Sequence, residues 1–168
     1  MGKDTRIPYL NGRVKMLSKK TKYALKAVLY LARKYEKGPI LISDLSREEG
    51  IPKKFLELIL LALKNNGLLQ SKKGKGGGYY LGKPPAEISM GKVVRIMEGP
   101  VALVPCVSVT AYAPCGECLD ERTCGIRLVM KEIREATAKI LDKTSLADVL
   151  EREGREKEKG QDILNYAI

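Results

Sequence analysis

The residues with the clearest chemical potential in this 168-residue chain are its four cysteines, which lie within nineteen positions. They are Cys106, Cys115, Cys118 and Cys124, in the pattern C-x8-C-x2-C-x5-C. Thiolates are the usual protein ligands of iron–sulfur clusters and of structural zinc, and four of them in one short loop can converge at little cost in loop closure. The pattern therefore predicts a metal site.

The spacing leaves the kind of metal open. Zinc sites formed by cysteine alone usually contain two CxxC pairs, and this chain has only one, from Cys115 to Cys118. The spacing leaves the two close, with an iron–sulfur cluster ahead and zinc as the alternative. Separately buried thiols without a metal are a third interpretation.

The chain contains no histidine, which removes the commonest general base and the commonest neutral metal ligand. Catalytic histidine triads, HExxH metalloproteases and Cys/His zinc fingers are therefore excluded. No run of about 18 apolar residues is present, and residues 1–15 are polar and unlike a signal peptide. We expect a cytoplasmic protein without a membrane partner, where clustered thiols stay reduced and serve as metal ligands or redox groups.

Basic residues are concentrated in the first half of the chain. Lysine and arginine number 31 against 20 acids, a net charge of +11. Residues 1–85 contain 19 lysines and arginines and 6 acids, a net charge of +13, whereas residues 86–168 contain 12 and 14, a net charge of −2. For a single lysine a solvated surface is the ordinary explanation, but this asymmetry predicts a polyanionic partner, nucleic acid rather than a membrane surface.

The first half has the pattern of a winged helix-turn-helix. Apolar periodicity predicts helices over residues 20–36, 42–49 and 53–66, with Gly50-Ile51-Pro52 as the turn between the last two. Two short strands, 68–72 and 79–81, flank a glycine-rich turn and form the wing. The periodicity of the third helix predicts five core residues: Phe55, Leu56, Ile59, Leu60 and Leu63.

The second half holds the cysteines and a long helix. We expect a helix over 88–98, a Cys-bearing loop over 101–123 and a helix over 125–141, in which apolar residues recur at steps of three and four. These residues are Ile126, Val129, Ile133, Ala136 and Ile140. They predict a coiled-coil seam, used for homodimerisation rather than buried within one chain. Ser145 and Asp148 suggest the cap of a short last helix, and the charged stretch 151–160 is expected to fray.

The predicted fold is therefore mainly α, with a small β-hairpin wing and a long dimerisation helix. We expect a flexible N-terminal extension over 1–15, a winged helix-turn-helix DNA-binding domain over 16–85, a Cys-loop sensing and dimerisation region over 86–150, and a charged tail over 151–168.

The second helix of a helix-turn-helix places its first residues against base edges in the major groove. The candidates there are Lys53, Lys54, Phe55, Glu57 and Leu58. Lysine can bind guanine, glutamate can accept from cytosine, and an apolar group can contact the thymine methyl. Leu58 falls on the exposed face, where either the groove or the first helix could cover it, and Phe55 fits the core better than a base contact.

The wing turn contains no acid, so its residues are candidates for phosphate or minor-groove contact: Lys72, Lys73, Gly74, Lys75 and Gly76. Its glycines permit positive φ and close approach to phosphate. A nucleotide-binding glycine motif would need a helix after it, and here a second strand follows.

These motifs resemble the IscR/NsrR/CymR family of bacterial winged helix-turn-helix transcriptional regulators. The resemblance covers about residues 16–150. It rests on Tyr23-Ala24, Gly50-Ile51-Pro52, Phe55-Leu56-Glu57, Leu63-Lys64-Asn65-Asn66-Gly67-Leu68, Lys73-Gly74, Gly76-Gly77-Gly78-Tyr79 and Leu81-Gly82-Lys83. It implies a homodimer on double-stranded DNA, at a pseudo-palindromic operator. Many members hold a [2Fe-2S] or [4Fe-4S] cluster in the loop before the long helix, and the state of the cluster tunes operator binding. The resemblance implies the same for this chain.

The resemblance also bears on the metal ligands. Cys124 and Cys118 match the family's last and middle cysteines, while the first would fall near Tyr112, between Cys106 and Cys115. The fourth ligand of some relatives is a histidine, and Arg127 occupies that position. In others it is an acid on the first helix, at about Lys22 here. Neither residue is a plausible cluster ligand, so we expect all four cysteines to bind.

The sequence thus predicts a DNA-binding transcriptional regulator, not an enzyme, controlled by an iron–sulfur cluster. A zinc-bound or cluster-free thiol switch of the same fold is the first alternative. A small redox or electron-transfer protein is a second, although it would leave the basic half without a purpose.

Overall fold

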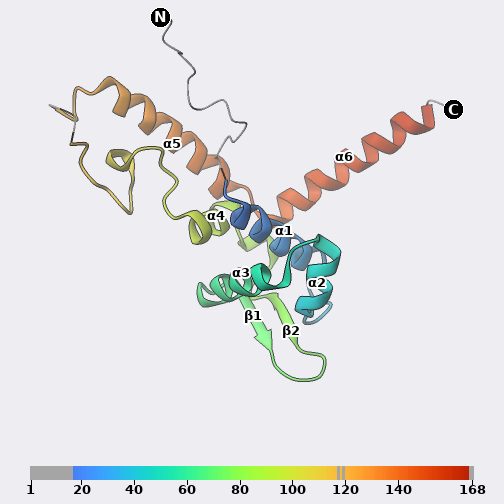
Figure 1. The fold of residues 1–168 in the computed structure, drawn as a ribbon. Helices are drawn as coiled ribbons and strands as arrows, with labels where there is room; N and C mark the ends of the chain where they lie inside the picture. Colours follow the sequence, from blue (N-terminus) through green and yellow to red (C-terminus); the bar gives the residue numbers. More distant parts are fainter. Residues whose placement is uncertain (1–16, 117, 119, 167–168) are drawn as a thin grey trace, which may run out of the picture.

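Three helices supply most of the hydrophobic core in the computed structural model, which describes residues 17–116, 118 and 120–166 (Figure 1). They are α1 (Lys19–Arg33), α2 (Ile42–Glu49) and α3 (Lys53–Asn65). Ile88, Val93 and Leu146 of the second half belong to the same core. The extension predicted over 1–15 lies outside the described residues. Ser18 caps α1, because its hydroxyl accepts a hydrogen bond from the Thr21 amide at 3.1 Å. Gly50 ends α2 in the left-handed conformation that glycine adopts without strain.

The core confirms the predicted face of α3 with one exception. Leu56, Ile59, Leu60 and Leu63 are fully buried against α1 and α2. Phe55, which was also assigned to the core, is 56% exposed, so that assignment is wrong. Its ring meets the ring of Tyr23 on α1 edge-on, with centroids 6.4 Å apart. This edge-on contact with Tyr23 therefore leaves more than half of the Phe55 side chain exposed.

The wing is a two-stranded antiparallel hairpin, β1 (Leu69–Lys72) and β2 (Gly78–Leu81). Ile40, in the segment before α2, pairs with Tyr79 through two backbone hydrogen bonds of 2.9 and 2.8 Å. Gly78 has a φ of +149°, and a side chain there would collide with the Ile40 carbonyl group. The strand end of the hairpin is therefore fixed to the segment before α2.

The second half begins with a short 3-10 turn, η1 (Pro85–Glu87), and helix α4 (Met90–Glu98), which packs against α1. The Cys loop follows and includes a second 3-10 turn, η2 (Pro105–Val107). Helix α5 (Gly125–Lys143) then returns along α4. Arg95 on α4 and Asp142 on α5 form a bidentate ion pair, with Nη2 and Oδ2 2.8 Å apart. The buried Gly91 leaves room for that pair, because a Cβ there would meet Asp142 and Arg95.

Helix α6 (Leu146–Tyr166) is longer than the sequence pattern predicted. Ser145 and Asp148 do form the predicted cap, with the Ser145 amide donating to Asp148 Oδ2 at 2.8 Å. The expectation that 151–160 frays is wrong, because the helix continues through it. Glutamate, lysine and arginine are good helix formers, and the pairs Arg155–Glu151 and Lys159–Glu156 support the exposed turns.

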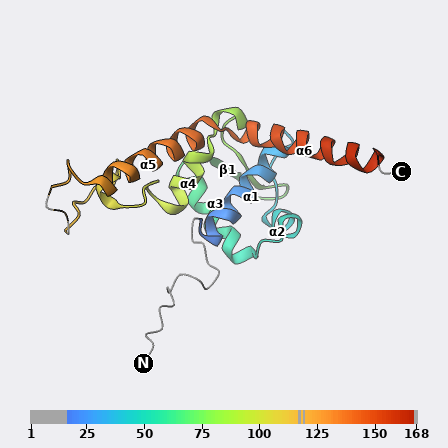
Figure 2. The same cartoon turned by 90° about the horizontal axis from the view of Figure 1, so that it is seen from above.

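The arrangement places helices α5 and α6 on one side of the molecule and α3 with the wing on the other (Figure 1). Seen from above, α5 and α6 extend in opposite directions from the body formed by α1, α3 and α4 (Figure 2). The wing and α3 lie on the side away from them (Figure 1). Among the described residues, no helix is both long enough and apolar enough to span a membrane.

Candidate nucleic-acid interface and metal centre

The exposed side of α3 and the wing form one basic groove. Its lining comes from α3, from the start of α2 and from the hairpin, and includes Lys53, Glu57, Lys64, Lys72, Lys73 and Gly74. Lys53, Lys54, Glu57 and the wing residues Lys72, Lys73, Gly74, Lys75 and Gly76 are all exposed, as the sequence predicted. A groove with these cations can follow a phosphate backbone while α3 meets the bases.

Leu58 is the residue of this face for which the sequence left two explanations. Its side chain is 66% exposed, so α1 does not cover it. Phe55, rather than Leu58, is the residue of this face that contacts α1, through Tyr23. Leu58 is therefore available to a partner, on the outward side of α3 next to the residues that line the basic groove.

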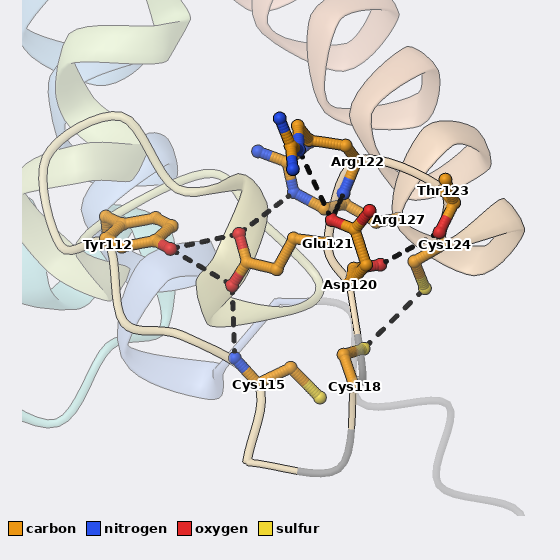
Figure 3. A network of polar contacts seen from close by, with 9 residues as sticks. All are labelled: Tyr112, Cys115, Cys118, Asp120, Glu121, Arg122, Thr123, Cys124 and Arg127. Carbon is orange, nitrogen blue, oxygen red and sulfur yellow. Dashed lines mark hydrogen bonds and ion pairs between the residues drawn. The ribbon is translucent and has the colours of Figure 1, made fainter.

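Two of the four cysteines are brought into contact by the fold. The Sγ atoms of Cys118 and Cys124 lie 3.7 Å apart, at the point where the Cys loop enters α5 (Figure 3). Cys115 belongs to the same turn, because its carbonyl accepts from the Cys118 amide at 3.3 Å. Cys106 is instead buried in η2. Within the part of the chain that the structure describes, no three ligand-type side chains already surround a metal position.

The surroundings of these thiols give them different acidities. Hydrogen bonds to the Cys115 and Cys124 sulfurs, together with burial, raise the pKa of Cys118 to about 12. The backbone amide of Arg127 and the Cys118 thiol lower the pKa of Cys124, and the Arg127 charge acts in the same direction. Cys124 thus sits at the amino-terminal end of α5, where free amides favour the thiolate that binds metals.

Glu121 organises the loop around the cysteines, and sequence reasoning did not identify it. Its carboxylate accepts from the Tyr112 hydroxyl at 2.9 and 3.0 Å and from the Cys115 amide at 3.4 Å (Figure 3). Arg127 Nε lies 3.5 Å from Glu121 Oε2, and the contact joins the loop to the first turn of α5. Glu121 is one of three acidic residues between Cys106 and Cys124, with Glu117 and Asp120, so residue type alone did not single it out.

We predict that Glu121→Gln weakens metal binding by the loop about 10- to 100-fold, the range typical of residues that orient metal ligands. The neutral amide keeps the size of the side chain but loses the ion pair with Arg127. Competition between the apoprotein and a chromophoric zinc chelator measures the affinity. Glu135→Gln on α5 is the matched control, because Glu135 is 54% exposed and its ion pair is with its neighbour Arg134, away from the Cys loop. Equal affinities for both variants would remove Glu121 from this role.

The residues predicted for dimerisation lie on an uncovered face of α5. Ile126, Val129, Ile133 and Ile140 are 70%, 52%, 40% and 64% exposed, and Ala136 is exposed as well. No side chain of α5 is buried within the single chain. An apolar stripe on a helix of this length is typical of a surface that another protein covers.

Comparison with known proteins agrees with this architecture. A family model described as Rrf2, iron-dependent transcriptional regulator, matches residues 17–152. The chain is 41% identical over 138 residues to an rrf2-like HTH-type transcriptional regulator of Rhodobacter capsulatus, covering 80% of this chain and 92% of the relative. It is 35% identical over 135 residues to NsrR of Geobacillus kaustophilus, covering 80% and 89%. The solved structure of CymR, the global cysteine regulator of Bacillus subtilis, superposes with a TM-score of 0.66 at 30% identity, covering 79% and 94%.

Proposed function

This chain belongs to the Rrf2 family of transcriptional regulators, and we propose that it is a cytoplasmic homodimer whose affinity for its operator is controlled by an iron–sulfur cluster in the Cys loop. The family membership confirms the resemblance noted from the sequence. Its relatives regulate transcription and are not enzymes, so the redox-enzyme alternative is set aside. The observation that carries the cluster proposal is the contact between Cys118 and Cys124 at the start of α5.

The thiols present fit a metal centre. A tetrahedral iron or zinc with metal–sulfur bonds of about 2.3 Å holds two sulfurs about 3.8 Å apart. The separation of 3.7 Å between Cys118 and Cys124 matches two ligands of one metal atom. Cys115 is the next ligand, being in the same turn, and Cys106 is the fourth candidate. Such a pair on one iron favours [2Fe-2S], because each iron of a [4Fe-4S] cluster takes a single cysteine.

A bound cluster would supply a redox-active and labile group, whose presence and oxidation state depend on the availability of iron, on oxidants and on the supply of clusters. The chain itself supplies the response. Cys124 immediately precedes Gly125, so a change in the loop acts directly on the first turn of α5. The contact between Glu121 and Arg127 is a second link between the loop and this turn. If α5 joins two protomers, its position sets the spacing of the two α3 helices. Half-sites on DNA lie about one duplex turn apart, so a loop movement passed to α5 through Cys124 and Arg127 would change the population of dimers that fits the operator.

Protein purified without oxygen tests this proposal. We expect a brown protein with iron and acid-labile sulfide, two of each per chain for [2Fe-2S]. Colourless protein with one zinc per chain would instead support a zinc-bound regulator of the same fold, since zinc fits the same pair of sulfurs. Colourless protein without metal would support a thiol switch based on Cys118 and Cys124.

DNA binding by the wing has its own test. We predict that Lys73→Ala weakens operator binding and reduces the slope of log affinity against log salt by about 1 for each wing on the DNA. Lys73 is exposed and lines the groove between α3 and the hairpin. Lys139→Ala on α5, also exposed, should leave the slope unchanged. Filter binding or fluorescence anisotropy at several salt concentrations gives the affinity and the salt slope. Identical slopes for Lys73→Ala and the wild type would show that the wing does not contact the DNA.

A further inference from the structure

The outward side of α3 carries an apolar stripe that the basic charge of the groove does not explain. With 3.6 residues per turn, Lys54, Leu58, Leu61 and Asn65 fall on one line, opposite the buried face of the helix. Leu58 is 66% exposed and Leu61 is 48% exposed. Two neighbouring leucines on the outermost face of a helix expose apolar surface to water at a cost in solvation, unless a partner covers them.

The charges around the stripe indicate what kind of partner fits it. On the side facing the wing, Lys53, Glu57 and Lys64 line the groove together with wing lysines. The wing turn from Lys72 to Gly78 contributes lysines and no acid. A protein partner would have to bring an apolar patch enclosed by acids. Duplex DNA offers this arrangement directly, because the thymine methyl groups lie on the floor of a major groove whose walls are phosphates.

We propose that Leu58, supported by Leu61, contacts thymine methyl groups in the major groove and so makes the operator preference depend on those methyls. The proposal rests on the DNA binding of the proposed function but not on the cluster. The lysines then give affinity for any duplex, whereas the leucine stripe distinguishes thymine from cytosine at the positions that it touches. We expect Leu58 to make the main contact, because it lies closer than Leu61 to the amino-terminal end of α3, and that end contacts the base edges.

Removing single methyl groups from the DNA tests the contact. Duplexes bound by the full-length protein are selected from a random pool, and each thymine of the selected site is replaced in turn by deoxyuridine, which lacks only the C5 methyl group. We expect one or two thymines per half-site whose replacement weakens wild-type binding about three- to tenfold, the scale of one buried methyl group. Leu58→Ala should bind the thymine and uracil duplexes equally. Leu103→Ala, an equally exposed leucine (67%) before η2, should keep the wild-type difference.

The outcomes separate this inference from the proposed function. A wild-type protein that selects a site but tolerates uracil at every thymine overturns the methyl contact alone. A Leu58→Ala variant with the full wild-type uracil penalty overturns it too, as does a changed oligomeric state of that variant by light scattering, which would assign the stripe to protein contact. Failure to select any duplex would overturn the DNA-binding function itself, and the methyl contact with it.

Discussion

Replacing Cys124 by alanine is expected to abolish the visible absorbance of the protein purified without oxygen, with iron and sulfide both falling to background. Cys124 is the thiol whose surroundings favour metal binding most. Its sulfur lies 3.7 Å from that of Cys118, and the amides at the start of α5 lower its pKa toward the thiolate. Without Cys124 the iron would keep only Cys118 and have an open coordination position, and we expect so exposed a cluster to be lost during purification.

Two further variants make the result specific. Thr123→Ala changes the adjacent exposed residue and should keep full cluster content, which controls for disturbance of the loop. Cys106→Ala tests the fourth ligand, because Cys106 is buried in η2 while the other three thiols share one turn region. Normal iron and sulfide in Cys124→Ala protein would contradict the ligand assignment outright.

The second large effect should come from the exposed face of α5. Ile133 is the central residue of the apolar stripe, and Ile133→Asp would place a carboxylate in the seam of the proposed dimer. We expect a monomer by light scattering, together with a loss of operator affinity on the order of 100-fold or more, because the two half-sites would no longer be bound by linked domains. No side chain of α5 is buried within the single chain, so the variant should still fold.

Lys131→Asp is the matched control for this experiment. It introduces the same carboxylate at an exposed position on the other side of the same helix. It should leave the dimer and its DNA binding intact. A dimeric Ile133→Asp protein with wild-type affinity would show that the stripe serves another contact.

The elements of this fold were largely predictable, because each has a local signal. Gly50-Ile51-Pro52 fixes the turn between α2 and α3, and the glycine run fixes the hairpin. Phe55 was assigned wrongly because helical periodicity gives the direction of a side chain but not the width of the surface that covers it. Position 55 falls at the border of the buried face, where the Tyr23 ring meets it edge-on and leaves it 56% exposed.

The remaining differences concern contacts between distant residues. Charge along α6 suggested a frayed end, but Arg33 on α1 pairs with Glu153 at 2.8 Å and ties the helix to the core. Glu121 acquires its role only when the loop folds back and brings Tyr112 and Arg127 to it. Types and spacing of residues identified the cysteines, whereas the groups that orient them depend on a loop conformation without periodicity.

The pairing of Ile40 with Tyr79 affects how the wing contributes to recognition. A hairpin of eight paired residues standing alone would be marginally stable and would lose its freedom only on meeting DNA. Here the single Ile40–Tyr79 bridge ties the hairpin to the segment before α2, so the base of the wing loses its conformational entropy during folding. The amides of Ile40 and Tyr79 should therefore exchange slowly with solvent in the free protein, and association with DNA should carry little additional entropic penalty from ordering the base of the wing.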